Sequence, residues 1–452
     1  YGTIAKRALT NSVSVVTPKD FTAGVASPLM SIQGKIAGLS VISPNGADPN
    51  SDPSLQLRGV NSINGDQGPL VVIDGVPGVD INLIAKEDIE SISVLKDASA
   101  ASIYGTRASG GVILITTKKA RPGAVSVNFS TELQLQTLGV TPDILSAQEF
   151  RDKGRTEVYG QTVYDYGTST DWLKQVTNSA PFSQRYAVSA SGGTETYGIN
   201  ISGYTRNANA IAIDDNRHET GGRINTYFKL LDDRLELSTT INYTDINLEG
   251  VNNSIFEQAI SLNPTYPVYD KTSESGYYMI LNQPYFNNPV AEVKLQSNSY
   301  RTTLMLTNIL LKWNVTKDLS LNGSGAYKHI QNRSSNFVSK LHRASLEGNY
   351  KGSASLSAAQ SMDKTMELYA SYNHEFGSHN LNAVGGYSFQ EFNGDSFSAS
   401  NQDFLVDGLA EWNLGAGTYL SDGKAGMGSN KSVTTRLIAF FGRLNYSYKD
   451  RY

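Results

Sequence analysis

Few residues in this chain have the types and spacing that catalysis or metal binding would require. No serine lies in a nucleophile-elbow motif, and the absence of cysteine excludes disulfides and thiolate metal sites. The histidines are scattered, and none has zinc-ligand spacing with a carboxylate partner: His218, His329, His342, His374 and His379. The sequence therefore predicts no enzyme, no cofactor and no metal site.

One stretch carries oxygen side chains at a spacing typical of calcium loops, Asp48-Pro49-Asn50-Ser51-Asp52. Position six of such a loop requires a glycine and position twelve a glutamate, but this chain has Pro53 and Gly59 there. We interpret the stretch as a solvated turn.

Composition narrows the class of protein. The 38 basic and 42 acidic residues nearly balance, which gives no electrostatic case for nucleic-acid binding. No apolar run approaches 18 residues, so a helical membrane protein is excluded, and the start of the chain has no signal-peptide pattern. A membrane β-barrel remains open, because its strands alternate instead of forming such a run.

Long segments of alternating polarity begin near Val125. In 234–244, for example, leucine, isoleucine and tyrosine share one face with Thr239, while glutamate, serine, threonine and asparagine share the other with Arg234. Alternation over this length indicates one apolar and one polar environment. We predict ten strands: 125–136, 183–192, 196–207, 219–230, 234–246, 300–315, 318–331, 363–376, 380–393 and 432–448.

The connections between these strands alternate in length. Short turns are predicted at 193–195, 231–233, 316–317 and 377–379, and long connections at 137–182, 208–218, 247–299, 332–362 and 394–431. Outer-membrane barrels combine short periplasmic turns with long extracellular loops. A soluble β-sandwich would not need this asymmetry, although composition alone does not exclude one. Aromatic residues near both strand ends fit the interfacial girdles of a barrel: Trp313, Phe376, Tyr448 and Tyr243.

The first 120 residues predict a separate α/β unit. Ser27-Pro28 should open a helix that runs to Gly38, and strands are expected at 39–43 and 54–58. The segment 69–118 then predicts strand, turn, strand, a short helix beginning after Asp97 and ending at Gly105, and a last strand.

The amino-acid sequence of this unit resembles the plug domain of SusC/RagA-type TonB-dependent outer-membrane transporters. The resemblance is carried by Leu57-Arg58-Gly59, Val72-Ile73-Asp74-Gly75-Val76-Pro77, Ile89-Glu90-Ser91-Ile92, Val94-Leu95-Lys96-Asp97-Ala98 and Tyr104-Gly105. It departs in having Leu57 where isoleucine is usual, and Ser109-Gly110 where Ala-Asn is usual.

The resemblance implies an N-terminal α/β plug domain over residues 1–120, followed over residues 121–452 by antiparallel transmembrane β-barrel strands. The beginning at Tyr1 resembles the point just after the family's TonB-contacting box. The implied function is uptake of an oligosaccharide or peptide across the outer membrane, with a SusD-like lid lipoprotein as partner and TonB, ExbB and ExbD as energy source. Two alternatives stay open: a siderophore-type receptor without a lid, and a non-transporting barrel in outer-membrane lipid that serves as surface anchor or adhesin. A plug argues against the anchor, which has no use for a gated lumen.

Two groups of residues are candidate sites. Strand parity places three carboxylates on the inward face, where we expect plug arginines to pair with some of them: Arg58 and Arg107 with Glu132, Glu236 and Glu367. Hydration of all five in a wet interior is the alternative. Rings and amides in two loops could contact either the ligand or the lid: Asn61, Ser62, Asn64, Asp66, Gln67, Tyr266, Tyr269, Tyr277, Tyr278 and Tyr285.

Ten strands and a plug cannot form a closed barrel together. Side chains alone fill the interior of a barrel near eight strands, and plugged lumens occur at about 22 strands. We therefore expect an open, curved sheet with free edges at its first and last strands, representing an incomplete barrel.

Overall fold

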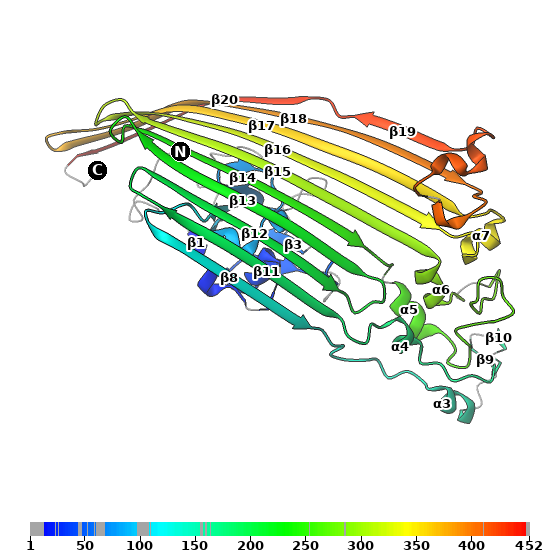
Figure 1. Cartoon of the computed structure of the whole chain (residues 1–452). Helices are drawn as coiled ribbons and strands as arrows, with labels where there is room; N and C mark the ends of the chain where they lie inside the picture. Colours follow the sequence, from blue (N-terminus) through cyan, green and yellow to red (C-terminus); the bar gives the residue numbers. More distant parts are fainter. Residues whose placement is uncertain are drawn as a thin grey trace.

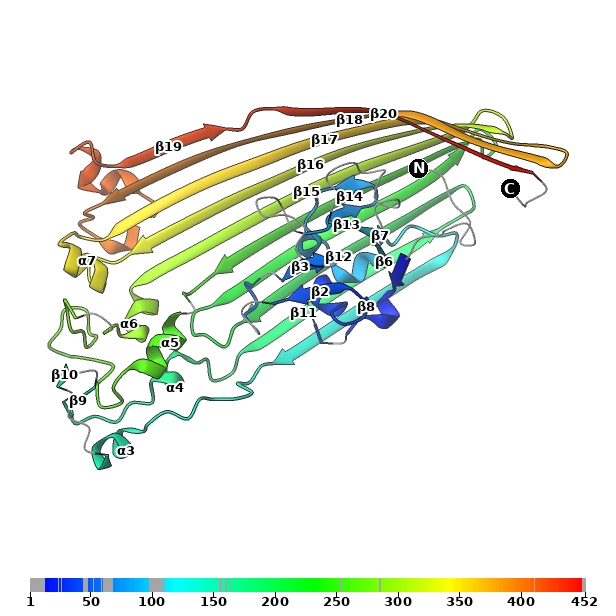
Figure 2. The same ribbon diagram turned by 180° about the vertical axis from the view of Figure 1, so that it is seen from behind.

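The computed structural model of the chain describes residues 13–448 apart from a set of gaps: 23, 26, 44–47, 52, 58, 60–67, 97–107, 109, 154–156, 159–160, 163, 253, 284–285 and 410. Two larger sheets dominate it, a small one early in the chain and a long curved one that follows (Figures 1 and 2). No helix in the described ranges has the length and apolar character needed to cross a membrane.

The large sheet has eleven antiparallel strands that follow one another in chain order. They are β8 (Gly123–Leu135), β11 (Phe182–Gly193), β12 (Tyr197–Asn209), β13 (Asn216–Leu230), β14 (Leu235–Glu249), β15 (Gln296–Asn314), β16 (Leu319–Val338), β17 (Ser353–Phe376), β18 (His379–Gln402), β19 (Gly426–Lys431) and β20 (Thr435–Tyr448). Both β19 and β20 pair with β18, at different heights, so together they occupy one edge of the sheet. The opposite edge is β8, whose pairing in the described residues is with β11.

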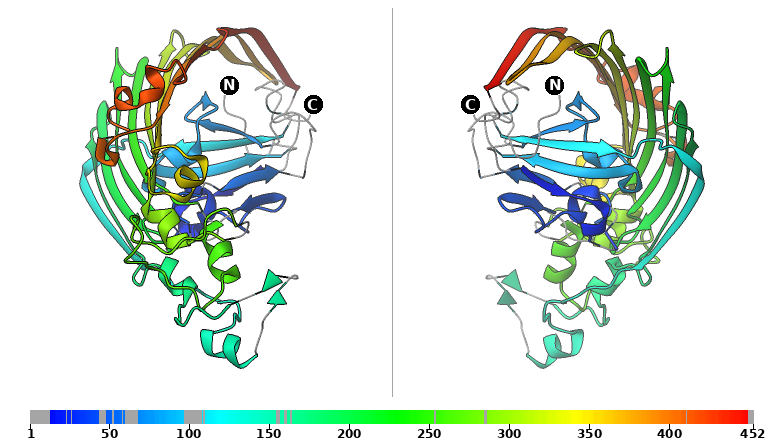
Figure 3. Two further views of the ribbon diagram at one scale, coloured as in Figure 1. Left: turned by 90° about the vertical axis from the view of Figure 1, so that its right-hand side faces the viewer. Right: turned by 90° about the vertical axis from the view of Figure 1, so that its left-hand side faces the viewer.

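This sheet confirms the predicted open, curved arrangement of ten strand positions. Figure 3 shows it as an arc that bends around the small sheet. The tight turns between strands also lie where the sequence placed them; in the turn at Leu231, Asp232 and Asp233 all three residues have positive φ angles of 52–63°, as a twisted hairpin turn requires.

Two of the predicted long connections are wrong in extent. Strand β16 continues to Val338, β17 begins at Ser353 and β18 continues to Gln402, so much of 332–362 and 394–431 is strand. These extensions are rich in serine and asparagine and lack apolar alternation, so the pattern that identifies a half-buried strand is missing. Two strands also occur where one was predicted at the end of the sheet. Strand β20 matches the predicted strand 432–448, and β19 precedes it in the segment 394–431, for which a loop was predicted.

The two faces of the large sheet differ in polarity. Large apolar side chains are exposed on the outer face, among them Phe129, Ile241, Ile309, Trp313 and Phe440. The inner face contacts the small sheet and carries mainly polar groups. An apolar outer band with a polar interior is the pattern of a transmembrane β-barrel wall.

The small sheet has five strands in the order β1-β6-β7-β4-β5. Their bounds are β1 (Val13–Val16), β4 (Leu70–Ile73), β5 (Val76–Pro77), β6 (Ile89–Leu95) and β7 (Val112–Thr117), with β4 and β7 parallel. Strands β2 (Leu39–Ile42) and β3 (Ser54–Leu57) form a separate hairpin, as expected. Short 3-10 helices connect the elements: η2 (Pro18–Asp20), η3 (Ile81–Leu83) and η4 (Lys86–Asp88).

The helix predicted from Ser27 to Gly38 is mostly absent. Helix α1 covers only Pro28–Ser31, with the Ser27 hydroxyl accepting from the Met30 amide as its N-cap. Gly34 and Gly38 adopt φ angles of 73° and 80°, which turn the chain out of a right-handed helix. The short helix expected between Asp97 and Gly105 falls outside the described residues.

The main apolar core joins the two sheets. Strand residues of the small sheet, such as Ile92 and Ile115, pack in one cluster with Ile246, Leu304 and Leu306 from the inner face of the large sheet. Leu304 is fully buried there. The small sheet therefore packs against an apolar patch on the inner face of the large sheet, in addition to its polar contacts.

The long connections carry structure of their own. They contain α3 (Ala147–Asp152), β9 (Glu157–Val158), β10 (Gln161–Thr162), α4 (Trp172–Val176), α5 (Ser254–Ser261), α6 (Pro289–Lys294), α7 (Arg343–Gly348) and three 3-10 helices, η6 (Asp407–Leu409), η7 (Leu414–Ala416) and η8 (Thr418–Leu420). A second apolar core around Trp172, Ile255 and Val290 packs α4, α5 and α6 together. The connections 137–182 and 247–299 thus fold against each other at one end of the sheet.

Candidate functional site

The candidate site is the contact between the small sheet and the inner face of the large sheet, which we call the wall. Its centre is the 3-10 helix η4, where three consecutive charged residues each contact a different wall strand. Lys86 Nζ lies 2.6 and 2.8 Å from the Glu132 carboxylate of β8. Glu87 accepts from Arg185 of β11, and Asp88 Oδ1 accepts from the Ser202 hydroxyl of β12 at 2.5 Å. One turn of backbone is thereby fixed to three strands.

The Arg185–Glu87 pair has the geometry of a strong ion pair. Nε and Nη2 of Arg185 lie 2.8 and 2.7 Å from the two carboxylate oxygens of Glu87. The Arg185 side chain is 6% exposed and that of Glu87 is 23% exposed, so water screens the pair only partly. Burial acts to raise the pKa of Glu87, but the hydrogen bonds and charge of Arg185 outweigh it and hold that pKa below its ordinary value.

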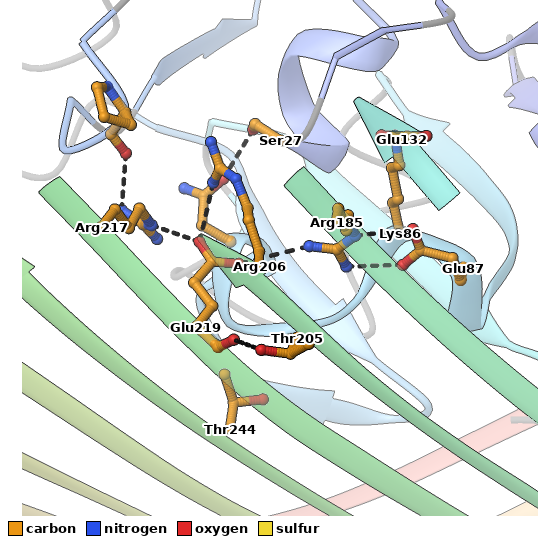
Figure 4. Close-up of polar contacts among 12 residues, drawn as sticks. Ser27, Lys86, Glu87, Glu132, Arg185, Thr205, Arg206, Arg217, Glu219 and Thr244 are labelled. Atoms are coloured by element: carbon orange, nitrogen blue, oxygen red, sulfur yellow. Dashed lines mark hydrogen bonds and ion pairs between the residues drawn. The ribbon is translucent and has the colours of Figure 1, made fainter. Parts of the chain in front are cut away.

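Behind this pair lies a cluster of three arginines around one carboxylate (Figure 4). Arg206 Nη1 donates to Glu219 Oε1 at 3.0 Å, and Arg185 Nη1 lies 3.5 Å from Glu219 Oε2. Arg217 donates to the same carboxylate and also, at 3.1 Å, to the carbonyl of Pro49. The Arg185 guanidinium stacks 4.2 Å from the centre of the Tyr204 ring. The cluster therefore links wall strands β11, β12 and β13 to the small sheet.

A second set of contacts holds the end of β7. Arg223 donates to the Lys118 carbonyl at 2.6 Å and to the Thr117 hydroxyl at 2.5 Å. The Ala120 amide donates to the side-chain oxygen of Asn225 at 2.9 Å. Thr117 in turn donates to the Asp74 carboxylate through both its amide and its hydroxyl. The turn after β4 and the end of β7 are thus one hydrogen-bonded unit attached to β13.

A third set attaches the β4–β5 region to the central wall strands. Asn308 donates to the Asp74 carbonyl at 2.7 Å, and Lys328 donates to the Gly78 carbonyl at 2.8 Å. The Thr244 hydroxyl donates to the Leu83 carbonyl at 2.8 Å. These bonds go to backbone carbonyls, so they depend on the position of the small sheet more than on its side chains.

The turn interpreted from the sequence as solvated is a contact point. The Asn50 side chain donates to the Asp215 carboxylate and to the carbonyls of Asn216 and Glu249, at the end of the wall that carries the long connections. Burial and the neighbouring charge of Asp48 raise the pKa of Asp215 from 3.8 to about 7. Because the docked state then binds the proton more tightly, this group favours docking most below about pH 3.8, and that stabilisation is lost as the pH rises through about 7.

The predicted plug–barrel residues are distributed unevenly over this interface. Glu132 contacts the small sheet, but through Lys86, which the sequence analysis did not name. Glu236 lies 3.5 Å from Lys312 of the neighbouring strand, and it lines, together with Glu367, a cavity of about 520 Å³ beside the Asp74 turn. Arg58 and Arg107 fall outside the described residues, so the proposed arginine pairs stay predictions.

The residues that sequence reasoning missed had a readable signal. Lys86, Glu87 and Asp88 are three adjacent charges between the apolar pair Ile84-Ala85 and Ile89. Strand parity alone would also have placed Arg185 and Glu219 on the inward face. This short charged turn lies between the segments Val72–Pro77 and Ile89–Ile92, which carry the resemblance to plug domains.

The predicted tyrosines belong to two groups. Tyr266 and Tyr278 form a cluster with Tyr166 and Phe286, with ring centres 4.6–5.9 Å apart. Burial, followed by the proximity of Tyr166, raises the pKa of both Tyr266 and Tyr278 to about 12.

The second group is Tyr269 and Tyr277, whose ring centres are 5.5 Å apart. Contact of either group with ligand or lid stays a prediction. Outside the described residues lie the other loop candidates: Asn61, Ser62, Asn64, Asp66, Gln67 and Tyr285.

Within the described ranges, no group of three or more histidine, aspartate or glutamate side chains is arranged to bind a metal ion. Apart from the apolar patch around Leu304, the contacts are ion pairs and hydrogen bonds, which can break and re-form without a chemical step. This is the property expected of a gate.

Comparison with known proteins agrees with this geometry. Residues 5–112 match the family model described as TonB-dependent Receptor Plug Domain. The TonB-dependent receptor SusC of Bacteroides thetaiotaomicron is 28% identical over 491 residues, covering 100% of this chain and 47% of that protein. The TonB-dependent receptor P3 of Formosa agariphila is 26% identical over 469 residues, covering 100% of this chain and 45% of that protein.

Among solved structures, the RagAB peptide importer in the closed-closed state superposes with a TM-score of 0.80 at 22% identity, over 97% of this chain and 54% of that chain. At this identity the superposition establishes the fold. The chain spans about half the length of the curated relatives it matches. The small sheet therefore belongs to a TonB-dependent receptor plug domain, the large sheet has the fold of the barrel wall in the RagAB importer, and the chain as a whole is similar to TonB-dependent receptors of the SusC type.

Proposed function

We propose that the complete protein imports an oligosaccharide or peptide across the outer membrane in a TonB-dependent manner. The observation that carries this proposal is the η4 contact, where the plug is held to the concave face of the wall by the Lys86, Glu87 and Asp88 side chains. A plug whose side-chain attachments at η4 are polar and breakable can close a lumen reversibly. We propose no catalytic step, since import requires none in this protein.

The geometry also supports a path for the opening force. Strand β1 is at the edge of the plug sheet, where Val13–Val16 pair with Ile92–Leu95 of β6. Strand β6 begins at Ile89, directly after Asp88 of η4. A pull on the N-terminal side of β1 would therefore load β6 and, through it, the three contacts of η4. TonB, energised by ExbB and ExbD, would supply that pull.

We further propose that residues 1–120 act as the plug and residues 121–452 as barrel wall, and that a SusD-like lipoprotein closes the outer mouth. One structural neighbour is described as a peptide importer, which supports the peptide class, whereas the oligosaccharide class rests on the sequence resemblance to SusC/RagA-type transporters. The connections 137–182 and 247–299, with their shared apolar core and exposed tyrosines, are the part of this chain that we expect to meet the lid or the ligand.

Extraction of the complete protein in mild detergent tests the partner. We expect a lipoprotein to co-purify at equal stoichiometry, and cells lacking TonB to lose uptake of the cognate nutrient. Purification as a lone chain in several mild detergents, with uptake still dependent on TonB, would instead indicate a receptor without a lid. Uptake that persists without TonB would contradict the proposed function itself.

A further inference from the structure

The wall continues well beyond the plug, toward the end that carries the long connections (Figures 1 and 2). Strands β15 to β19 pair in register there, so their side chains form rows across the sheet. Leu304 packs against the plug, and the residues two, four and six positions before it in β15 lie on the same inner face. The rows that begin at Thr302, Tyr300 and Asn298, which we call the neutral rows, therefore face the space between the plug and the long connections.

The neutral rows lie wholly in the described part of the chain, and none of their side chains is charged. The rows that begin at Asn298 and Thr302 contain only asparagine, serine, threonine, alanine and glycine. The middle row consists of Tyr300, Ser334, Ser357, Ser398 and Gly428.

This composition is confined to the inner face. The outward-facing rows of the same strand segments carry Arg301, Arg333 and Asp395, so charged side chains are compatible with this part of the wall. Asparagine, alanine and glycine are also poor strand formers, and strand pairing alone would not favour them. The absence of charge from the neutral rows therefore reflects what the inner surface contacts.

The side chains of the neutral rows are accessible to a ligand. Tyr300 is 40% exposed, and Ser398 and Ser400 are exposed as well. A Cβ at Gly426, opposite Ser400, would lie 2.5 Å from the Ser400 hydroxyl, so glycine at this position leaves that hydroxyl uncovered. A hydroxyl group can donate one hydrogen bond and accept two, which leaves capacity for a ligand even where neighbouring side chains bond to each other.

A surface of this kind fits an uncharged molecule that is rich in hydroxyl groups. Serine hydroxyls and asparagine amides both donate and accept hydrogen bonds, so they can pair with sugar hydroxyls in many orientations. The exposed Tyr300 ring adds an apolar face against which a sugar ring can pack. A peptide with charged termini, or an acidic saccharide, would lose hydration here without meeting an opposite charge.

We propose that the neutral rows are a contact surface for an uncharged oligosaccharide on its way to the plug. The proposal rests on the proposed function and names the class of its cargo. With strands about 4.8 Å apart and same-face residues about 6.7 Å apart, the surface measures roughly 19 by 13 Å, enough to contact several sugar units. Repeated weak contacts suit transport, because the cargo must leave the surface as well as enter it.

Native mass spectrometry of the complete purified protein tests the class of cargo. The protein is incubated with three defined pools: neutral oligosaccharides cut from dextran, mannan and xylan, acidic oligosaccharides cut from polygalacturonate, and short peptides with free termini. We expect retention mainly from the neutral pool. Equal or greater retention from the acidic or the peptide pool, or retention from none of the three, would overturn the proposal.

A matched pair of variants locates the contact. Ser334 lies on the inner face, and its chain neighbour Ser335 faces outward. In calorimetric titration with the retained saccharide, Ser334→Leu should weaken binding about 2- to 10-fold, the range for one neutral hydrogen bond of roughly 0.5–1.5 kcal/mol. Ser335→Leu should leave the affinity unchanged, and equal affinities of the two variants would overturn the assignment to the neutral rows. If Ser334→Leu does not fold, Ser398→Leu on β18 makes the same test against the same control.

Failure of this test can be separated from failure of the proposed function. TonB-dependent uptake of a peptide or an acidic saccharide by cells would sustain the transporter while refuting the uncharged cargo. Uptake that persists without TonB would refute the proposed function itself.

Discussion

The Arg185–Glu87 pair allows a quantitative test of the gate. In the variant Arg185→Met, Glu87 loses both of its bonds, at 2.8 and 2.7 Å, and remains as a partly buried negative charge. Removing one partner of a buried pair costs roughly 3–5 kcal/mol. Since Glu87 is 23% exposed, water offsets part of this penalty and we take the lower limit, about 3 kcal/mol.

This free energy belongs to docking of the plug. At 1.4 kcal/mol per tenfold, the loss corresponds to an increase of about 100-fold in the population of undocked plug. We expect the complete protein, reconstituted in planar lipid bilayers, to show a matching rise in the fraction of time spent conducting. The current reports on the plug directly, because an undocked plug opens the lumen.

Two variants serve as controls for this measurement. The double variant Arg185→Met/Glu87→Met replaces the pair by apolar side chains of similar length, which is often neutral, and should conduct nearly as rarely as the native protein. Arg301→Met removes a similar bidentate pair, with bonds of 2.8 and 3.2 Å to Asp245, from the outer face. If Arg185→Met conducts no more than Arg301→Met, or if the double variant is as leaky as the single one, the pair does not hold the gate.

Three further predictions concern separate parts of the interface. Asp215→Asn should abolish the pH dependence of plug docking between pH 5 and pH 8, measured as the protection factor of amide hydrogen exchange at the Asn50 turn, which corrects for the intrinsic rise of exchange with pH; protection that still falls with rising pH would assign the effect elsewhere. Leu304→Ala should destabilise the folded protein by about 2–5 kcal/mol, because Leu304 is fully buried between the sheets. Thermal unfolding measures this loss of stability. Met305→Ala on the outer face should cost far less in that assay, and equal losses would contradict the packing described. Gly111→Ala should be more harmful than Gly75→Ala, since both have φ near 90° but only the new Cβ at Gly111 would clash, 2.3 Å from Leu57 Cδ2; plug stability in urea distinguishes them.

Much of the fold could be predicted from the sequence because it rests on local signals. Period-two alternation located part of every wall strand except β19, and short polar turns separated several of the neighbouring strands. The alternation of apolar and polar residues ends where the strands extend beyond the apolar band. For this reason the sequence predicted loops for the end of β16, the beginning of β17 and the end of β18. Strand continuation there depends on pairing with neighbours, as in Ser355↔Ser400, and single-strand composition does not reveal it.

The candidate site was less predictable because it is built from segments far apart in the chain. Parity placed Glu132 correctly on the inward face, but its partner Lys86 is 46 residues away and lies outside the most distinctive motifs. The three arginines around Glu219 come from three strands, and their convergence follows from the register of β11, β12 and β13. Register is a property of the assembled sheet.

The most direct test of the account is to lock the plug to the wall. The chain contains no cysteine, and the Ser202 hydroxyl donates to Asp88 Oδ1 at 2.5 Å, so Asp88→Cys/Ser202→Cys places thiols on two side chains that contact each other across the interface. We predict that oxidised cells carrying this pair lose uptake of the cognate nutrient, that a reductant restores it, and that each single cysteine variant transports under both conditions. Uptake by the oxidised, fully cross-linked protein at the rate of the reduced one would contradict the claim that plug movement at this contact opens the path.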